Sequence, residues 1–334
     1  MENPETSLKI ATAGEALIDL IGRPDGLFDP CLGGSVFNFT RAMARQQIGT
    51  LYLNPLSGDR FGRRLAQALL ADGVQLARPE PVPQTTSLAV VALSESGHPD
   101  YAFYRQGVAD RAVSAEGLMR SCDAAPTLEM VCSGCLALDP EDAAIYLPWL
   151  AACRQAGKTV VVDANLRPSV MPDLAAYRRH VLAALQLADV IKASDEDLGH
   201  LGIAGSTPLE QAKNLLAGTG AHLMALTLGG EGACLLTRGG QVWLAREAEP
   251  VQVVDTVGAG DCFLAGLLTA VLLEKDLVLE QLADAPARRI LSHALASASL
   301  CVMQRGCVPP SRDEVLARMR DFPCRLSVAA QASR

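Results

Sequence analysis

DTVGAGDCF, at residues 255–263, joins a run of small residues to an apolar pattern with helical spacing. The small residues Gly258, Ala259 and Gly260 lead directly into an acid, Asp261. The start of a helix offers unpaired amide groups and a partial positive charge, and glycines let a phosphate approach the backbone closely. We therefore interpret residues 258–260 as an anion hole.

Asp261 would lie in the first turn of this helix, where the helix dipole favours its ionised form. A carboxylate there can accept a proton from a substrate hydroxyl, while the nearby amides stabilise charge on a phosphoryl group in transfer. This combination indicates phosphate transfer to a hydroxyl, so the absence of a lysine beside the glycines in the sequence is no defect. The alternative is an ordinary favourable acid in a first helical turn.

The composition of the chain favours an α/β protein. Of 334 residues, 49% are hydrophobic and only 4% aromatic, which is typical of helices packed on a buried sheet. The formal net charge is −8 and no run of lysine and arginine stands out, so we expect no nucleic-acid partner.

The sequence also predicts where the protein is found. The first residues carry acids and lack an apolar segment, unlike a signal peptide. The longest apolar run, 262–273, is too short to span a bilayer, so we expect no membrane partner. Ten cysteines without a secretion signal indicate reduced thiols, and we expect a cytoplasmic protein.

Short strand-like runs alternate with helical patterns along the chain. The strands are expected at 8–14, 50–56, 128–134, 158–164, 188–194 and 222–229. The helices are expected near 36–47, 60–72, 141–156, 174–186, 207–218, 259–274, 285–303 and 312–320. This alternation predicts a three-layer α/β/α fold, with a mostly parallel sheet between two layers of helices.

Two segments interrupt this alternation. Residues 86–106 predict a hairpin around the polar turn 94–100, and residues 14–34 are short, strand-like and rich in glycine and proline. Together they predict a small separate sheet, which would suit a lid over a cleft. The expected division is an α/β core at 1–13, 33–86 and 112–322, a β lid at 14–32 and 87–111, and a flexible tail at 323–334.

The wider stretch VDTVGAGDCFLAGLL, residues 254–268, resembles the signature of the ribokinase-like, PfkB-type carbohydrate kinases. Further matches to this family, several of them closest to fructokinases, follow in order along nearly the whole chain. They are GEALIDL (14–20), LGGSVFNFTRAMARQ (32–46), GDRFG (58–62), YAFYRQGVAD (101–110), DANLRP (163–168) and TLGGEG (227–232). Several motifs in order are far more specific than any one of them.

The resemblance implies roles for individual residues. Asp261 would be the general base, and Gly258, Ala259 and Gly260 the anion hole. The sugar would be bound by Asp19, Gly33, Gly34, Asn38, Arg105 and Arg167. Otherwise the GGS segment is a plain turn, Asn38 a surface helix residue, and either arginine a solvated one.

The resemblance also implies bound ATP and magnesium. Ser194, Thr227, Gly229, Gly232 and Gly260 would bind ATP. The family's N-x-x-E segment appears here as Ser194-x-x-Asp197, and the shorter Asp197 would reach Mg²⁺ through water.

A monovalent-cation site is the third implied feature. Asp255 and the carbonyl groups of Val257, Cys301, Gln304 and Gly306 resemble the K⁺ site of ribokinases, although Pro310 stands where a serine ligand is expected. Near the sugar, Val36 and Phe37 replace a small residue and a proline, and Met171 stands near the position of a frequent tryptophan.

The resulting hypothesis is an ATP-dependent kinase that phosphorylates a primary hydroxyl of a small sugar, with D-fructose giving fructose 6-phosphate. The alternatives are a 2-keto-3-deoxygluconate kinase, whose acid Arg105 and Arg167 could clamp, a ribokinase or nucleoside kinase, and a non-catalytic sugar-binding protein. A dinucleotide-dependent dehydrogenase is remote, because no G-x-G-x-x-G follows a strand.

The apolar face of the lid, with Leu88, Val90 and Ala92, predicts a homodimer through the lid.

Two other sequence patterns resemble functional motifs, of which we reject the first and interpret the second as structural. AGKT at 156–159 runs into a strand, whereas a P-loop enters a helix. The cysteines of the C-x-x-C pattern at 132–135 are interpreted as buried packing residues, with a redox or zinc role as the alternative. Cys262 is also interpreted as a packing residue, with sensing of oxidation near the site as the alternative.

Overall fold

The computed structural model describes residues 7–23, 25–93, 99–274 and 277–328. The turn of the expected hairpin at 94–98 and the end of the expected tail at 329–334 lie outside these ranges. Within the described ranges no helix combines the length and the apolar character that crossing a membrane requires.

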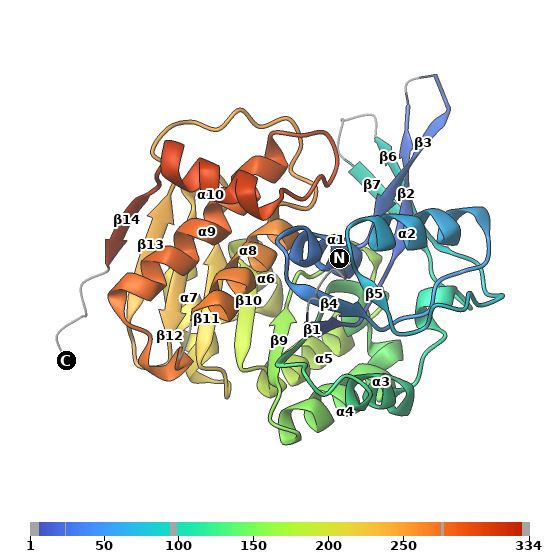
Figure 1. Ribbon diagram of the computed structural model, residues 1–334, viewed down its shortest axis with the longest axis horizontal. Coiled ribbons are helices and arrows are strands. Elements are labelled where there is room, and N and C mark those ends of the chain that lie inside the picture. The colour runs from blue at the N-terminus through green and yellow to red at the C-terminus, as the bar shows by residue number, and fades with distance from the viewer. Residues whose placement is uncertain (1–6, 24, 94–98, 275–276, 329–334) are drawn as a thin grey trace, which may run out of the picture.

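A ten-stranded sheet forms the centre of the described residues, in the order β14-β13-β12-β11-β10-β9-β8-β1-β4-β5 (Figure 1). Its parallel strands are β1 (Leu8–Thr12), β4 (Gly49–Tyr52), β5 (Gln75–Leu76), β8 (Met130–Gly134), β9 (Thr159–Asp163), β10 (Val190–Ser194) and β11 (Leu223–Thr227). An antiparallel edge follows, made of β12 (Ala233–Thr237), β13 (Val242–Arg246) and β14 (Arg325–Val328).

The strands of the sheet contribute to two cores, because successive side chains of a strand point to opposite faces. In β9, Val160 and Val162 belong to one core and Val161 to the other. In β11, Met224 belongs to the same core as Val160, and Ala225 belongs to the same core as Val161. The parallel strands are buried on both faces and are therefore mostly apolar, as the sequence predicts for a three-layer fold.

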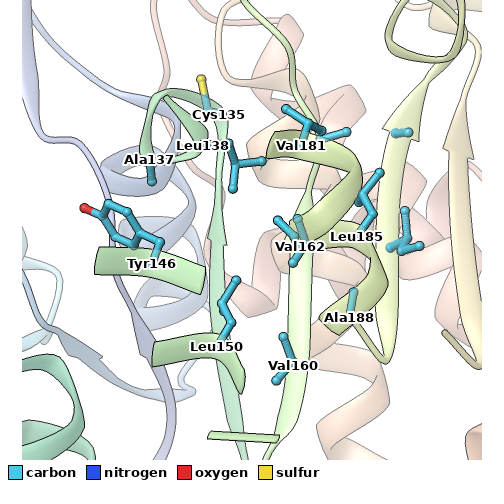
Figure 2. Packing of buried hydrophobic residues seen from close by; sticks show 14 of the residues in the cluster. Cys135, Ala137, Leu138, Tyr146, Leu150, Val160, Val162, Val181, Leu185 and Ala188 are labelled. Atoms are coloured by element: carbon cyan, nitrogen blue, oxygen red, sulfur yellow. The ribbon is translucent and has the colours of Figure 1, made fainter. Parts of the chain in front are cut away.

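Helices cover both faces of the sheet (Figure 1). One layer contains α1 (Ser35–Arg45), α8 (Ala259–Leu273) and α9 (Asp284–Val302), and α10 (Arg312–Asp321) packs on α9. The other layer contains α3 (Ala115–Asp123), α4 (Ala143–Gln155), α5 (Leu174–Leu187), α6 (Asp195–Leu201) and α7 (Pro208–Ala217). Figure 2 shows this second core, where side chains of β9 lie beside Leu150 of α4 and Leu185 of α5.

A small separate sheet stands beside the core, in the order β3-β2-β6-β7. Its strands are β2 (Leu17–Gly22), β3 (Phe28–Gly33), β6 (Ser87–Leu93) and β7 (Pro99–Tyr104). They come from the two interrupting segments of the sequence, joined by the parallel pairing of β2 with β6. Its base packs on α1 and α2 (Arg60–Ala71) through a cluster that includes Ile18, Phe37 and Leu65.

The expected flexible tail is wrong for Arg325–Val328. These residues form β14, which pairs antiparallel with β13. Without it, β13 would be an edge strand with unpaired amide and carbonyl groups, and β14 satisfies them. Helices α3 and α6 are additions that the sequence patterns did not predict.

Candidate active site

Asp261 lies in the first turn of α8 and is held by two side chains of α1. The Ser35 hydroxyl donates a hydrogen bond to Asp261 Oδ1 at 2.7 Å, and Asn38 Nδ2 donates to Oδ2 at 3.1 Å. These partners are 226 and 223 positions from Asp261 in the chain. The fold thus brings together the two segments that the sequence marked most strongly.

Further polar groups fix this pair of contacts. Asn165 Nδ2 donates to Ser35 Oγ at 2.8 Å, and Glu15 Oε1 accepts from the Ser35 amide at 2.9 Å. Asn38 Oδ1 is buried without a hydrogen-bond partner among the described residues. Since an unpaired buried acceptor costs free energy, a ligand hydroxyl that donates to Asn38 would be favoured.

The environment of Asp261 suits a proton acceptor. The side chain is only 6% exposed, and burial raises its pKa above the usual value. Hydrogen bonds from Ser35 and Asn38, and then the charges of Lys192 and Arg167, oppose this rise because they favour the ionised form. The carboxylate therefore combines a raised proton affinity with donors that keep it oriented.

A lysine does lie beside the glycine-rich loop in space. Lys192, in the middle of β10, forms a buried ion pair with Asp163 at the end of β9, with 3.0 Å between Nζ and Oδ1. Its Nζ lies 2.9 Å from the position that a Cβ on Gly260 would occupy. Sequence reasoning missed Lys192 because its strand, VIKAS, carries no motif of its own.

Charges around Lys192 keep it protonated. Burial lowers the pKa of its ammonium group, but the carboxylates of Asp163, Asp197 and Asp261 raise it overall. Burial raises the pKa of Asp163 to about 7, although Lys192 opposes the rise. A cation beside Gly260 and the amides of the loop together form a place for an anion.

The start of α8 has a backbone that favours glycine. Gly258 is the residue before the helix, with a φ of 79° in the left-handed region. A Cβ at this position would lie 2.2 Å from the Sγ atom of Cys307. The loop is therefore closely packed against Cys307.

The residues expected to bind the sugar lie around the start of α1. Asp19 in β2 lies beside Gly33 of β3, and a Cβ on Gly33 would be 2.0 Å from Asp19 Oδ2. Burial raises the pKa of Asp19 to about 6, and Arg167 opposes the rise. Gly34 precedes α1 with a φ of 101°, and Asn38 follows one turn later.

The two predicted arginines have different surroundings. Arg167 Nη1 donates to Asn165 Oδ1 at 2.8 Å, and Arg167 lies close enough to Asp19 and Asp261 to oppose the rise that burial causes in the pKa of both. Arg105, which follows β7 of the lid, is only 8% exposed and pairs with Asp139 at 3.3 Å. The alternative of a solvated Arg105 is therefore wrong, and its contact with a substrate stays a prediction.

The turn expected to bind ATP follows β11. Thr227 ends this strand, and Gly229 and Gly232 lie in the turn to β12. A Cβ on Gly232 would lie 2.1 Å from the carbonyl oxygen of Ala245, so the pairing of β12 with β13 itself requires a glycine. Their contact with a nucleotide stays a prediction.

Ser194 and Asp197 form a capping box at the start of α6. Ser194 Oγ accepts from the Asp197 amide at 3.1 Å, and Asp197 Oδ2 accepts from the Ser194 amide at 2.8 Å. Asp197 Oδ1 accepts from the Leu166 amide at 2.7 Å. Both carboxylate oxygens of Asp197 thus bind backbone groups, which fits a contact with Mg²⁺ only through water.

Asp255 joins the two loops that the resemblance associates with a monovalent cation. Its Oδ1 accepts from the Val257 amide at 3.0 Å, and its Oδ2 accepts from the Gly306 amide at 2.8 Å. The loops expected to offer carbonyl ligands are therefore adjacent, and the binding of K⁺ between them stays a prediction.

An open cavity of about 830 Å³ lies elsewhere, beside β5 and α3, and is lined by residues such as Leu53, Arg78 and Arg120. It contains none of the predicted site residues. We therefore assign the chemistry to the polar network around Asp261 rather than to this cavity.

Comparison with known proteins identifies the family of this protein. The signature of the pfkB family carbohydrate kinases matches residues 7–314. The match covers most of the chain, so this protein belongs to the pfkB family of carbohydrate kinases. The enzyme class expected from the sequence is thereby confirmed.

Individual relatives point the same way. Fructokinase from Rhizobium leguminosarum bv. trifolii is 32% identical over 279 residues, which cover 82% of this chain and 83% of that protein. Fructokinase from Escherichia coli is 30% identical over 313 residues, which cover 92% of this chain and 98% of that protein.

Solved structures share the fold. Fructokinase from Xylella fastidiosa with bound ATP matches at a TM-score of 0.77 and 25% identity, covering 95% of this chain and 99% of that one. Fructokinase from Vibrio cholerae O395 with fructose, ADP and calcium ion matches at a TM-score of 0.75 and 25% identity, covering 94% of this chain and 99% of that one. The ribokinase-like fold expected from the sequence is confirmed.

Proposed function

We propose that this carbohydrate kinase transfers the γ-phosphate of ATP to a primary hydroxyl of D-fructose, giving fructose 6-phosphate. The observation that carries the proposal is the position of Asp261, buried at the start of α8 and fixed by Ser35 and Asn38. The relatives named fructokinase, and the related structures with fructose or ATP bound, support the choice of substrates.

In the proposed reaction, Asp261 accepts the proton of the sugar hydroxyl as the hydroxyl oxygen attacks the γ-phosphorus of ATP. The bond between this phosphorus and the bridging oxygen breaks, and ADP leaves. The amides of Gly258, Ala259 and Gly260 and the ammonium of Lys192 balance the negative charge during transfer. Because these donors are fixed in the folded protein, little reorganisation is needed when the charge moves.

The sugar would be held by residues around the start of α1. Asp19 can accept from two neighbouring hydroxyls, and the unpaired Asn38 Oδ1 can accept from another. Gly33 and Gly34 allow the backbone to approach the ring. Arg105 would contact the sugar from the end of the lid, where its ion pair with Asp139 joins the lid to the core.

Cofactor roles are assigned by the same reasoning. Ser194, Thr227, Gly229 and Gly232 would line the nucleotide side, together with Gly260 of the loop. Mg²⁺ would arrive with ATP and contact Asp197 through water, because both oxygens of Asp197 accept backbone hydrogen bonds. When bound, it would neutralise charge on the phosphates.

A monovalent cation would occupy the site beside Asp255, where the 255–257 and 301–306 loops meet. We propose K⁺ for it, and an assay in K⁺ and Na⁺ buffers of equal ionic strength would test this assignment. Equal rates in both buffers would contradict it.

A 2-keto-3-deoxygluconate kinase is less well supported by the charges. An acidic sugar would need free cations, but Arg105 is paired with Asp139, and Arg167 has Asp19 as a neighbouring carboxyl group. Of the two predicted arginines, only Arg167 is then left to bind a carboxylate. An Arg167→Ala variant that loses turnover with the acid but keeps it with neutral sugars would favour this rival.

The test of the main proposal is an ADP-release assay on a panel of sugars with ATP and Mg²⁺. We expect the highest kcat/KM with D-fructose, and much lower values with ribose, nucleosides and 2-keto-3-deoxygluconate. Turnover with another sugar but not with fructose would overturn the choice of substrate. Sugar binding by calorimetry without any turnover would instead support a non-catalytic protein.

We also propose a homodimer formed through the lid. Leu27, Phe28 and Tyr104 of the lid segments are 60%, 48% and 61% exposed, which leaves apolar surface for a second copy to cover. Leu88 packs against the chain's own cluster instead, and the side chain of Ala92 lies outside the described residues. A monomer by light scattering at micromolar concentration would contradict the dimer.

The cytoplasm is the proposed location. All ten cysteines are free thiols, which suits a reducing compartment. Fractionation of cells that produce the natural protein would test this, and recovery in the secreted fraction would contradict it.

A further inference from the structure

Three cysteines that the proposed reaction does not use lie together behind the anion hole. Cys262 belongs to the first turn of α8, Cys301 to the last turn of α9, and Cys307 to the loop that follows α9. Their Sγ atoms all lie within 4.8 Å of one another. We call these residues the thiol cluster.

The thiol cluster is buried but has one open side. Cys262 and Cys301 are 0% exposed, whereas Cys307 is half-buried. Cys301 Sγ donates a weak hydrogen bond to the Val257 carbonyl at 3.5 Å, which ties the cluster to the glycine-rich loop. A small ion could therefore enter past Cys307 and reach the two buried sulfurs.

The spacing of the sulfurs suits a metal ion. Zinc–sulfur bonds of about 2.3 Å place the sulfurs of a tetrahedral site about 3.8 Å apart. Sulfurs within 4.8 Å of one another need only small side-chain rotations to reach this arrangement. Thiolates are soft ligands that prefer zinc, cadmium or copper(I) over magnesium and potassium.

No other group of three potential ligands of this kind occurs among the residues that the structure describes. Cys122 and Cys153 contact each other as a pair only, and Cys132 and Cys135 belong to no group of three potential ligands among the described residues. The interpretation of Cys262 as a packing residue is therefore incomplete, because its neighbours come from segments that only the fold brings together.

We propose that the thiol cluster binds one thiophilic metal ion, with Zn²⁺ as the ion and water as the fourth ligand on the Cys307 side. Binding releases the protons of the three thiols, and the resulting ZnS₃ group carries one net negative charge. Cys307 Sγ lies 2.2 Å from the Cβ position of Gly258, so this charge would stand directly behind the anion hole.

The bound ion would therefore inhibit the kinase. A negative group behind Gly258 weakens the attraction of the loop for phosphate, and fixing Cys307 restricts the loop that it contacts. This second part rests on the proposed function, whereas ion binding itself does not. We expect the KM for ATP to rise about tenfold when the site is filled.

The test uses the full-length protein, reduced and freed of metal, with Cd²⁺ as a spectroscopic probe and Zn²⁺ in competition. We expect one equivalent of Cd²⁺ to bind with an ultraviolet thiolate-to-metal charge-transfer band. Cys307→Ser should weaken binding at least ~100-fold, since it removes a direct ligand. Cys301→Ser provides a second variant from another segment.

Cys324→Ser is the matched control, because Cys324 is also half-buried but lies outside the thiol cluster. It should keep the band and the stoichiometry. The proposal is overturned if wild-type protein gives no band, or if Cys307→Ser binds Cd²⁺ as tightly as wild type. It is also overturned if mild oxidation joins two of the cluster thiols while the reduced protein binds no ion.

Kinase activity is measured in parallel. A rise in the KM for ATP with Zn²⁺ in wild type, absent in Cys307→Ser, supports inhibition through this site. If no sugar is phosphorylated, the proposed function fails, but the charge-transfer band still decides whether the metal site exists.

Discussion

Helices α8 and α6 of this kinase each carry a buried acid in the first turn, and the two acids are held in different ways. Asp261 at the start of α8 accepts hydrogen bonds from the side chains of Ser35 and Asn38. Asp197 at the start of α6 accepts from the backbone amides of Ser194 and Leu166. Asp261 adjoins a loop that fits an anion, whereas Asp197 closes a capping box.

This difference separates a chemical role from a structural one. Side-chain donors can exchange for a ligand hydroxyl, because the hydroxyl and amide groups can turn to new partners. Backbone amides cannot turn in this way, because the peptide planes that contain them would have to reorient. We therefore expect Asp261 to control the rate and Asp197 mainly the free energy of unfolding.

The largest expected effect is that of Asp261→Asn, which keeps the shape but cannot accept a proton. We expect kcat to fall at least ~1000-fold, within the range typical of a general base, while the melting temperature stays close to that of wild type. A steady-state ADP-release assay measures the rate, and calorimetry measures the melting temperature.

Glu196→Gln is its control, because Glu196 is an exposed acid in the first turn of α6. It should keep the wild-type kcat. A well-folded Asp261→Asn protein with wild-type turnover would remove the distinction between the two helix starts.

The second effect concerns Lys192, whose ammonium lies beside Gly260. In Lys192→Met we expect kcat/KM for ATP to fall ~100-fold or more, because one preorganised cation at the transferring phosphate is lost. The double variant Lys192→Met/Asp163→Asn avoids leaving Asp163 as an unpaired buried charge. If this folded double variant kept wild-type kcat/KM, Lys192 would be purely structural.

The third effect concerns Asp19 and the binding of the sugar. Asp19→Asn replaces one of the two acceptor oxygens with an amide donor and removes the charge, so we expect the KM for the sugar to rise ~10–100-fold with a smaller change in kcat. Kinetics at saturating ATP separate the two parameters. A selective fall in kcat would move Asp19 from binding into the chemical step.

The pH dependence sharpens this assignment. Burial raises the pKa of Asp19 to about 6, so its ionised form is lost as the pH falls through that value. We expect kcat/KM for the sugar to decline below about pH 6 in wild type. Asp19→Asn should lose this part of the decline and keep the part that belongs to Asp261, whose pKa is also raised. An identical profile in both proteins would contradict the role of Asp19.

The smallest effect on the rate is expected for Asp197, to which we assign a structural role. Asp197→Asn places an amide group against a backbone amide, and we expect the free energy of unfolding to fall by ~1–3 kcal/mol. The kcat should change less than tenfold, measured beside chemical denaturation. If stability were unchanged and kcat fell ~1000-fold, Asp197 would be a direct ligand of the reacting groups.

Much of the fold could be predicted from the sequence, because local patterns specify it. The apolar strand VVVD of β9 and the glycine loop before α8 carry their structure in adjacent residues. Strand β14 could not be predicted in this way. Arg325–Val328 is too short to stand out as a strand in the sequence, and it pairs along the edge that β13 offers.

The candidate site likewise contains some residues that could be predicted from the sequence and others that could not. Asp261 and Asn38 stand in recognisable segments, so their importance could be read from the sequence. Lys192 and the Asp163 that pairs with it reach Gly260 only through the order of β9 and β10 in the sheet. Likewise, the buried ion pair of Arg105 depends on how the lid packs on the core.

The most direct test of the role of Asp261 is a crystal structure with D-fructose and a non-hydrolysable ATP analogue. We expect the primary hydroxyl of the sugar to lie about 2.6–3.2 Å from an oxygen of Asp261, with the terminal phosphate against residues 258–260. A hydroxyl that faces another acceptor, with Asp261 bound only to Ser35 and Asn38, would contradict the proposed chemistry.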